Sequence, residues 1–187
     1  MIAPFIPNDS TGDTPLLHLD DITKTYREGD ADRVVLKNLS LTLDRGTTAV
    51  LMGRSGAGKS TLLNLVSGID LPTSGRVVVD GTDLTTLSET ERTLFRRAHI
   101  GFVFQSFNLI STLTVVENVL LPLELSGTST AASRRRAEEV LAHVGLGDRL
   151  DSFPDRLSGG EQQRVAVARA LAHDQLFVLA DEPTGNL

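Results

Sequence analysis

The sequence of 187 residues contains no cysteine, which excludes disulfide bridges, thiolate metal sites and a cysteine nucleophile. It also lacks an apolar run of the roughly 18–20 residues that a membrane-spanning helix needs. A basic surplus is missing too, since the formal net charge is −6. Proteins that bind duplex nucleic acid usually carry a basic face, so we expect no nucleic-acid partner. The N-terminus has neither the basic region nor the continuous apolar core of a signal peptide, which favours a cytoplasmic protein.

Composition and apolar patterning indicate a globular α/β protein. With 40% hydrophobic and 22% charged residues, the chain resembles an average soluble domain. Residues 1–15, rich in proline, threonine, aspartate and glycine, predict a flexible tail. Apolar stretches predict strands at 16–26, 34–43, 48–52, 75–81, 99–105 and 176–182. Helical signals predict helices at 61–68, 88–98, 115–125, 137–145 and 157–172. Strands that come first and then alternate with helices favour an α/β fold around a largely parallel sheet.

Three of these helices carry more detailed expectations. In the helix at 88–98, Ser88 and Glu91 predict a capping box. Its expected inner face consists of Leu94, Phe95 and Ala98. Pro122 is expected to bend or end the helix at 115–125. The helix before Gly145 is expected to end there and to bury a stripe formed by Ala137, Val140, Leu141 and Val144.

Residues 53–60 read GRSGAGKS and match the phosphate-binding pattern G-x-x-x-x-G-K-[ST] in full. The glycines let the backbone curl so that successive N–H groups point at phosphate oxygens, and the following helix adds its positive N-terminal end. Lys59 supplies a cation for the β- and γ-phosphates, and the Ser60 hydroxyl is a ligand for Mg²⁺. The alternative is a glycine-rich turn with an incidental lysine. A chance match in a chain of this length is on the order of one per cent.

The apolar stretch 176–180 leads directly into Asp181 and Glu182. A carboxylate at the end of a strand beside a phosphate-binding loop can hold Mg²⁺ through water. An adjacent carboxylate can then orient or deprotonate an attacking water. An acidic loop after a buried strand is also common, so this pair gains its meaning from the loop at 53–60.

The segment LSGGEQQR at 157–164 predicts a capped helix start with an anion-binding backbone. Ser158 can cap the helix, and Glu161 can reach back to it. Gly159 and Gly160 leave backbone N–H groups open to an anion. The helix that follows is apolar nearly all round apart from Arg169, so we expect it to be largely buried. An ordinary capped helix would satisfy the same local physics.

The segment LSGGEQQRVAVARAL resembles the signature of ABC ATPases, and it lies between a phosphate-binding loop and a strand ending in Asp-Glu, as in that family. The resemblance runs from about Leu16 to the last residue. It implies a P-loop NTPase fold of ABC type at 16–187, with a β-rich N-terminal part, a parallel-sheet core and a helical subdomain at about 106–165. It also implies that ATP binding and hydrolysis drive transport through a membrane permease.

Site residues follow from the resemblance by matching positions. Tyr26 matches the aromatic residue that stacks on adenine, and Gln105 matches the glutamine that senses Mg²⁺ and the attacking water. The resemblance implies catalytic roles for Glu182, as the base, and for Gln105 and Lys59. It implies that Ser60, Gln105 and Asp181 bind Mg²⁺. In this family the signature residues bind the γ-phosphate of the ATP held by a second ATP-binding subunit, and here they are Ser158, Gly159 and Gly160. The full set of implied ATP contacts is Tyr26, Gly53, Ser55, Gly56, Gly58, Lys59, Ser60, Thr61, Ser158, Gly159 and Gly160.

The implied partners are a second copy of the chain, in a head-to-tail dimer around two ATP molecules, and a permease. The surface at 106–125, with the helical stretch before the signature, corresponds to the region that receives the permease's coupling helix. The segments FVFQSFNLISTLTVVENV and ADEPTGNL resemble those of the branch that includes macrolide exporters and lipoprotein-releasing systems. The implied location is therefore the cytoplasmic, inner face of the cell membrane.

The chain departs from the family pattern after Asn186, where the family continues to a switch histidine. The four histidines, at 18, 99, 143 and 173, all precede the acidic pair. We therefore expect a truncated chain or a piece of a longer protein, with an intact ATP cradle, poor turnover and exposed apolar surface at 176–180. This leaves a non-catalytic nucleotide-binding fragment as the alternative function.

Two further classes share these motifs. DNA-repair and chromosome-maintenance ATPases place a long heptad-rich insertion between the loop and the signature, and this sequence has none. Translation-associated ATPases usually carry two such domains in one chain, and this sequence has one.

Overall fold

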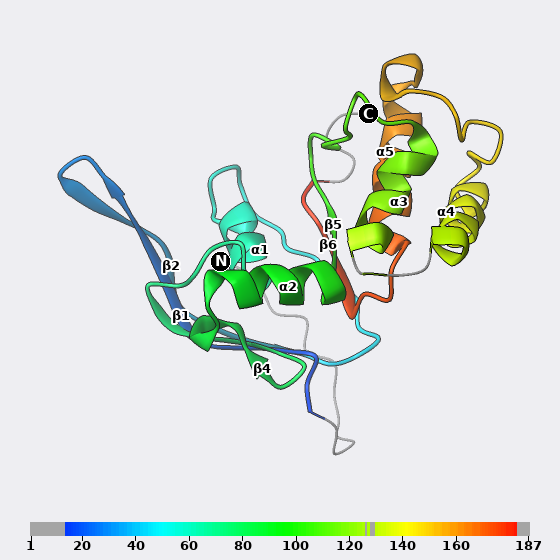
Figure 1. The fold of residues 1–187 in the computed structure, drawn as a ribbon. Helices are drawn as coiled ribbons and strands as arrows, with labels where there is room; N and C mark the ends of the chain where they lie inside the picture. Colours follow the sequence, from blue (N-terminus) through cyan, green and yellow to red (C-terminus); the bar gives the residue numbers. More distant parts are fainter. Residues whose placement is uncertain (1–13, 126, 128–129, 183–187) are drawn as a thin grey trace. The chain divides into compact units, whose positions relative to one another are not determined.

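The computed structural model describes residues 14–125, 127 and 130–182 (Figure 1). These residues form two compact units, the first ending at Thr93 and the second beginning at Leu94. Most of the expected tail at 1–15 lies outside the described residues, as do Pro183 to Leu187.

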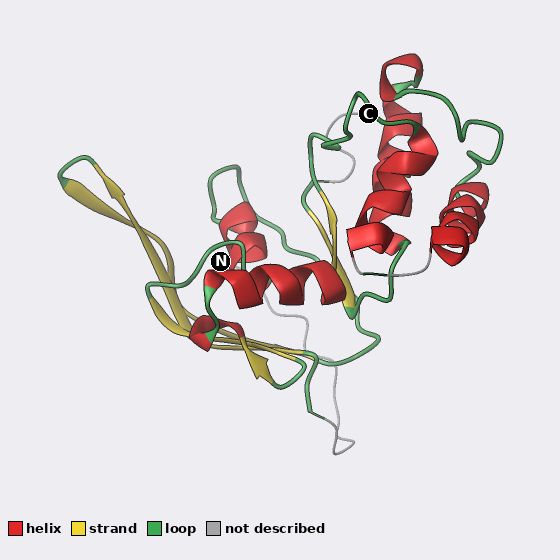
Figure 2. Cartoon of the chain, in the orientation of Figure 1, coloured by secondary structure: helices red, strands yellow, loops and turns green. Residues whose placement is uncertain are grey.

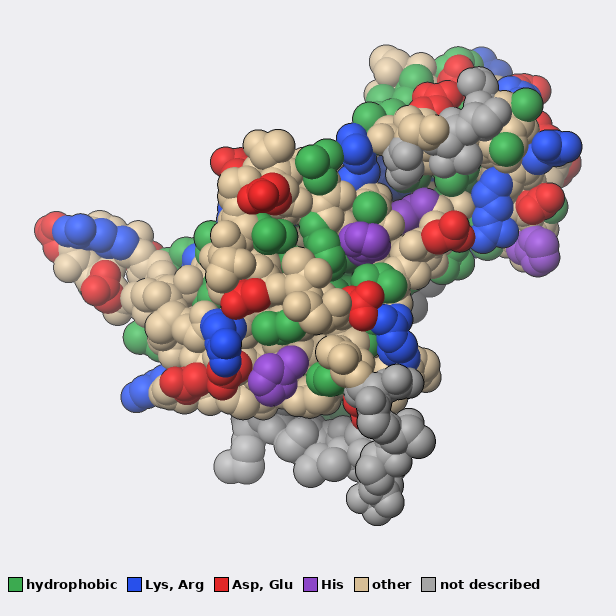
Figure 3. All heavy atoms as spheres, turned by 60° about the horizontal axis from the view of Figure 1, so that its bottom comes forward, with side chains coloured by type: hydrophobic (Ala, Val, Ile, Leu, Met, Phe, Trp, Pro, Cys, Tyr) green, Lys and Arg blue, Asp and Glu red, His purple; other side chains and the backbone are tan. Residues whose placement is uncertain are grey.

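The first unit is built on an antiparallel sheet with the strand order β2-β1-β3-β4. Its strands are β1 (Leu17–Glu28), β2 (Ala31–Leu43), β3 (Ser74–Val79) and β4 (Thr82–Asp83). The central strand β1 pairs with both neighbours, so that Leu19 lies opposite Leu41 and Val77. Alternating apolar residues thus form strands here as the sequence predicts. Charged side chains of both signs gather at the tip of the β1–β2 hairpin (Figure 3), where Arg33 and Glu28 form a 3.0 Å ion pair.

The core of this unit lies where the sheet meets α1 (Lys59–Val66) and the short 3₁₀ helix η1 (Leu84–Thr86). Its most deeply buried side chains, each at most 1% exposed, are Leu19, Ile22, Leu65, Val77, Val79 and Leu84. β3 can approach β1 closely because residue 75 is glycine. A Cβ atom there would lie 2.5 Å from the carbonyl oxygens of Asp20 and Asp21. The Asp80-Gly81 turn that links β3 to β4 has positive φ at both residues, as a tight hairpin turn requires.

The second unit combines a parallel pair of strands with three α-helices (Figure 2). The strands are β5 (Ile100–Val103) and β6 (Phe177–Ala180), which pair in register from Ile100 opposite Phe177. The helices are α3 (Val115–Leu125), α4 (Thr130–His143) and α5 (Gly159–Leu171), with a 3₁₀ turn η2 (Pro154–Arg156) before α5. The α/β fold class predicted from the sequence is confirmed.

The three helices of this unit share an apolar core. Fully buried side chains come from each of them, including Val119 of α3, Leu141 of α4 and Val165 of α5. The predicted stripe on α4 is confirmed, although Val144, just beyond the helix, is only partly buried. α3 continues past Pro122 and ends three residues later. Across the described residues, no helix is long and apolar enough to cross a membrane.

α5 packs directly against β5 at a glycine. A Cβ atom at Gly101 would collide with the backbone carbonyl oxygen of Ala170 on α5. Only glycine therefore allows the helix and the strand to come this close. This contact fixes the C-terminal half of α5 relative to β5.

Two sequence-based predictions are wrong. Residues 48–52 form no strand, and Val50 and Met52 are 77% and 76% exposed. A strand needs a neighbour for its backbone hydrogen bonds, and the described strands pair only with one another. In α2 (Glu89–His99), Leu94 and Ala98 are exposed rather than buried. The apolar stripe there consists of only three residues. Phe95 contacts His99 of the same helix, with the ring centres 4.7 Å apart and the ring planes tilted by 56°.

Candidate nucleotide-binding and catalytic sites

The loop at 53–60 has the backbone geometry of an anion cradle. Gly56 and Gly58 have φ values of 78° and 90°, which side chains disfavour. The Ala57 N–H donates a 3.1 Å hydrogen bond to the Arg54 carbonyl and closes the turn. Gly58 also packs tightly, since a Cβ there would lie 3.0 Å from Val35 Cγ1 on β2. The glycines thus shape the loop and bring the start of α1 against the sheet.

Lys59 folds back over this loop. Its Nζ donates hydrogen bonds to the carbonyl oxygens of Gly53 and Arg54, at 3.0 and 3.3 Å. The N-cap of α1 is Gly58, so no side chain caps the first amides of the helix. Ser60 follows on the exposed side of the first turn. A cation, uncapped amides and a hydroxyl therefore lie within one short segment, which is the donor set that a Mg²⁺-bound polyphosphate requires.

Tyr26 of β1 is half-buried and held by a charged pair. Its hydroxyl donates a 2.9 Å hydrogen bond to Asp70, and Lys24 Nζ lies 2.7 Å from the other oxygen of that carboxylate. The Lys24 ammonium also lies over the Tyr26 ring, 4.8 Å from its centre. The pKa of Tyr26 is raised, mainly by burial and next by the hydrogen bond to Asp70. A hydrogen bond between Tyr26 and Thr61 acts in the opposite direction and lowers it. Tyr26 and Thr61, both predicted to bind ATP, therefore lie together.

In the second unit, the structure brings together Gln105, Asp181 and Glu182. Gln105 follows β5 and Glu182 follows β6, at the carboxyl ends of two paired parallel strands. Gln105 Nε2 donates a 3.3 Å hydrogen bond to Glu182 Oε2. The Asp181 N–H donates to the Val103 carbonyl at 3.0 Å, which extends the ladder by one residue. The predicted metal and catalytic side chains of this unit thus share one edge.

The signature segment starts α5 with a complete capping box. The Ser158 hydroxyl and N–H donate to Glu161 Oε2 at 2.7 and 2.8 Å, and the Glu161 N–H donates back to Ser158 Oγ at 3.3 Å. The two hydrogen bonds that the Glu161 carboxylate accepts, first the one from the Ser158 hydroxyl and then the one from its N–H, hold the pKa of Glu161 below its ordinary value. Ser158 and Gly159 are exposed. The first turn of α5 is therefore well formed and accessible.

The sequence-based site misses several residues that order these segments. No sequence pattern marks Asp70, which holds Tyr26. Asn118 is fully buried on α3, where Oδ1 accepts from the Ile110 N–H at 2.8 Å and Nδ2 donates to nearby carbonyls. Arg169, recognised only as the polar exception on α5, donates to the carbonyls of Phe107 and Asn108 at 2.7 and 2.6 Å. A polar residue on a buried helix face is the signal that could have identified Asn118 and Arg169.

The predicted site residues are distributed over both units. Tyr26, Thr61 and the loop at 53–60 belong to the first unit, whereas Gln105, the signature and the acidic pair belong to the second. Among the residues that the structure describes, no cluster of three or more histidine, aspartate or glutamate side chains could hold a metal ion.

Comparison with known proteins places these motifs in one family. The family described as ABC transporter matches residues 36–185. An ABC transporter ATP-binding protein of Mycobacterium tuberculosis is 54% identical over 173 residues, covering 92% of this chain and 70% of that protein. The macrolide export ATP-binding/permease protein MacB of Brucella melitensis is 49% identical over 173 residues, covering 92% of this chain but only 27% of MacB.

A solved structure agrees with these matches. The ATP-binding cassette MJ0796, as a dimer in a post-hydrolysis state with ADP and Pi, is 44% identical and superposes with a TM-score of 0.85. The match covers 91% of this chain and 75% of that cassette. The chain therefore belongs to the ABC transporter family, as one of its ATP-binding subunits.

Proposed function

We propose that this chain binds Mg-ATP on the loop at 53–60 and hydrolyses it, and that it couples hydrolysis to transport through a membrane permease. The observation that carries the proposal is the loop itself. Left-handed glycines, an uncapped helix start and the Lys59 ammonium occur within eight residues. Phosphate is the ligand class that this combination selects.

Binding would use the residues of the first unit as follows. Lys59 would leave the carbonyls of Gly53 and Arg54 for the β- and γ-phosphates, because charge-assisted hydrogen bonds are stronger than those to neutral carbonyls. Amides of the loop and of α1 would receive the remaining phosphate oxygens, with Ser55, Gly56 and Thr61 among the contacts. The Tyr26 ring, held by Asp70, would stack on the adenine.

Hydrolysis would add residues of the second unit to Ser60 of the first unit. Ser60, Gln105 and Asp181 would hold Mg²⁺, which supplies charge stabilisation for the transferred phosphoryl group. Glu182 would accept the proton of the attacking water, and the Gln105 amide would orient that water. The 3.3 Å hydrogen bond between Gln105 and Glu182 supports this pairing of roles.

The proposed function also requires assembly with a second copy of the chain and with a permease. Ser158, Gly159 and Gly160 would bind the γ-phosphate held by a second copy of the chain, as the dimeric state of the MJ0796 cassette supports. The surface at 106–125 would receive a permease on the inner face of the cell membrane. Similarity to MacB, whose name states macrolide export, supports an export system of that branch.

The hydrolysis step is tested by Glu182→Gln in the 187-residue chain. The substitution removes the proton acceptor and keeps the shape, so we expect ATP binding to persist while turnover falls about 100-fold or more. Asp174→Asn, which neutralises an exposed carboxylate of the same unit, is the matched control and should leave turnover unchanged. Turnover in Glu182→Gln equal to that of the unsubstituted chain would contradict the assignment. Binding without any turnover by the unsubstituted chain would limit the function to nucleotide binding.

A further inference from the structure

We propose that Arg169 is a positioning residue for Gln105, because it holds the loop that follows Gln105 in a single conformation. The inference rests on the proposed function, since Gln105 acts in that function on the metal and the attacking water. Arg169 lies on α5, and the loop it contacts lies more than sixty residues earlier in the chain.

The contact is a two-pronged one. Arg169 Nη1 donates to the Asn108 carbonyl at 2.6 Å, and Nη2 donates to the Phe107 carbonyl at 2.7 Å. Arg169 is half-buried, and this burial lowers the pKa of its guanidinium. The planar guanidinium can grip two adjacent carbonyls at once, which a lysine ammonium does with less geometric definition.

The loop needs such a partner because its backbone is strained. Phe107 and Asn108 both have left-handed φ values, 54° and 50°, a conformation that non-glycine residues adopt rarely. Within the loop, the Phe107 N–H donates to the Phe104 carbonyl at 3.1 Å, and the Asn108 N–H donates to the Ser106 carbonyl. Two successive left-handed residues persist only where surrounding contacts enforce them. Arg169 binds the carbonyls of both.

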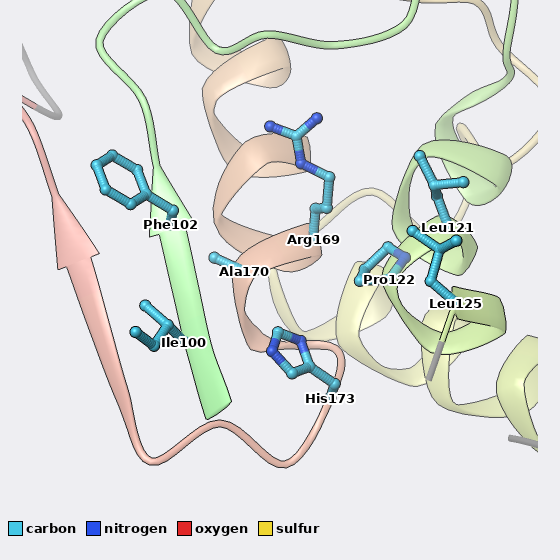
Figure 4. Close-up of a pocket in the computed structure, with 8 residues that line it drawn as sticks. All are labelled: Ile100, Phe102, Leu121, Pro122, Leu125, Arg169, Ala170 and His173. Atoms are coloured by element: carbon cyan, nitrogen blue, oxygen red, sulfur yellow. The ribbon is translucent and has the colours of Figure 1, made fainter. Parts of the chain in front are cut away.

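Arg169 projects from a fixed support. The next residue on α5, Ala170, packs its backbone against Gly101 of β5, which is the strand that leads to Gln105. Figure 4 shows Arg169 extending from α5 with its guanidinium directed away from His173. α5 thus touches both sides of Gln105: the strand before it and the loop after it. Because the Gln105 amide donates to Glu182, a displaced loop would also disturb the proton acceptor.

Hydrogen exchange tests the loop claim without nucleotide. We would compare amide exchange in the segment 104–112 of the 187-residue chain with that of Arg169→Ala and Arg169→Lys. The expected result is exchange about 10-fold faster in Arg169→Ala, with an intermediate rate in Arg169→Lys. Arg135→Ala, which removes an exposed arginine of α4, is the control and should leave the segment unchanged. Unchanged exchange in Arg169→Ala would overturn the inference.

Steady-state kinetics then separate positioning from general stabilisation. Arg169→Ala should lower kcat for ATP about 10-fold and leave KM within about twofold, as for an outer residue of a metal site. Gln105→Ala should do the same, and the double variant should lose no more than Gln105→Ala alone, because both changes remove one function. Additive losses, or a normal kcat in Arg169→Ala despite a loosened loop, would overturn the positioning role.

The two proposals fail in distinguishable ways. If the unsubstituted chain does not hydrolyse Mg-ATP, the proposed hydrolysis is contradicted and Gln105 has no reaction for which to be positioned, whereas hydrogen exchange still decides the loop claim. If Arg169→Ala does not fold, Arg169→Lys carries both measurements, since it keeps the charge and the long aliphatic stem. A lysine variant with normal loop exchange and normal kcat would show that charge alone suffices, and it would overturn the role of the two-pronged contact.

Discussion

The Tyr26 hydroxyl donates a 2.9 Å hydrogen bond to the carboxylate of Asp70, forty-four residues further along the chain. The same carboxylate pairs with Lys24, whose ammonium covers one face of the tyrosine ring. Asp70 therefore fixes both the position of the ring and the cation beside it.

The ring and the hydroxyl of Tyr26 are expected to contribute separately to ATP affinity. Tyr26→Ala removes the stacking surface and should weaken ATP binding about 10-fold, since stacking of a base on an aromatic ring contributes roughly 1–3 kcal/mol. Tyr26→Phe keeps the ring and should change the affinity by less than about threefold. Equilibrium titration with ATP measures both. Equal losses in the two variants would show that the hydroxyl, not the ring, carries the effect.

Asp70 gives the first unit an acid-sensitive contact. Burial opposes ionisation, but hydrogen bonds from Lys24, Tyr26 and the Leu71 N–H outweigh it and hold the pKa of Asp70 below the ordinary 3.8. Because the pKa is lower in the folded state, the stabilisation is present above about pH 4 and is lost as the pH falls through the folded-state value. Denaturant unfolding of Asp70→Asn beside the unsubstituted chain should show a stability difference that is constant near pH 7 and shrinks below about pH 4. A difference that does not shrink would contradict the account.

Two capping boxes of equal geometry separate the capping role of Ser158 from its proposed role in assembly. Ser88 and Glu91 at the start of α2 make the same three hydrogen bonds as Ser158 and Glu161, at 2.8, 2.7 and 3.3 Å. Ser88→Ala and Ser158→Ala should each cost about 1 kcal/mol of stability. Only Ser158→Ala should weaken ATP-dependent dimerisation, by about 10-fold or more, as measured by analytical ultracentrifugation. The same effect in both variants would reduce Ser158 to an ordinary cap.

Gly101 is expected to be intolerant of even the smallest side chain. In Gly101→Ala the new methyl group meets the backbone carbonyl of Ala170, so α5 must move away from β5. We expect the free energy of unfolding to fall by about 1–3 kcal/mol. Gly147→Ala is the control, because a Cβ there meets only Ala142 atoms at 3.6 Å, and its effect should stay within about 0.5 kcal/mol. Similar stabilities of the two variants would contradict the close approach of helix and strand.

Features set by a few neighbouring residues could be predicted from the sequence. The loop at 53–60 follows from glycines that allow left-handed backbone, and the capping boxes follow from a side chain bonding three residues away. The stripe on α4 follows from helical periodicity. Each of these depends on chemistry contained within one or two helical turns.

Features set by distant contacts could not be predicted in this way. The apolar run at 48–52 looks like a strand, but strand formation depends on a partner, and no described strand pairs with it. The partners of Arg169 lie 61 and 62 residues away, and Asp70, the partner of Tyr26, lies 44 residues away. Both contacts arise only when the chain folds back on itself, so the sequence indicated that Arg169 was unusual without indicating what it binds.

The most direct test of the central claim is Mg-ATP binding by the purified 187-residue chain, measured by titration calorimetry beside Lys59→Ala and Lys37→Ala. Lys37 is an exposed lysine on β2 of the same unit and controls for the loss of a positive charge. The account predicts saturable binding that Lys37→Ala retains and that Lys59→Ala weakens about 30-fold or more. Absence of binding by a folded sample, or equal binding by Lys59→Ala, would contradict it.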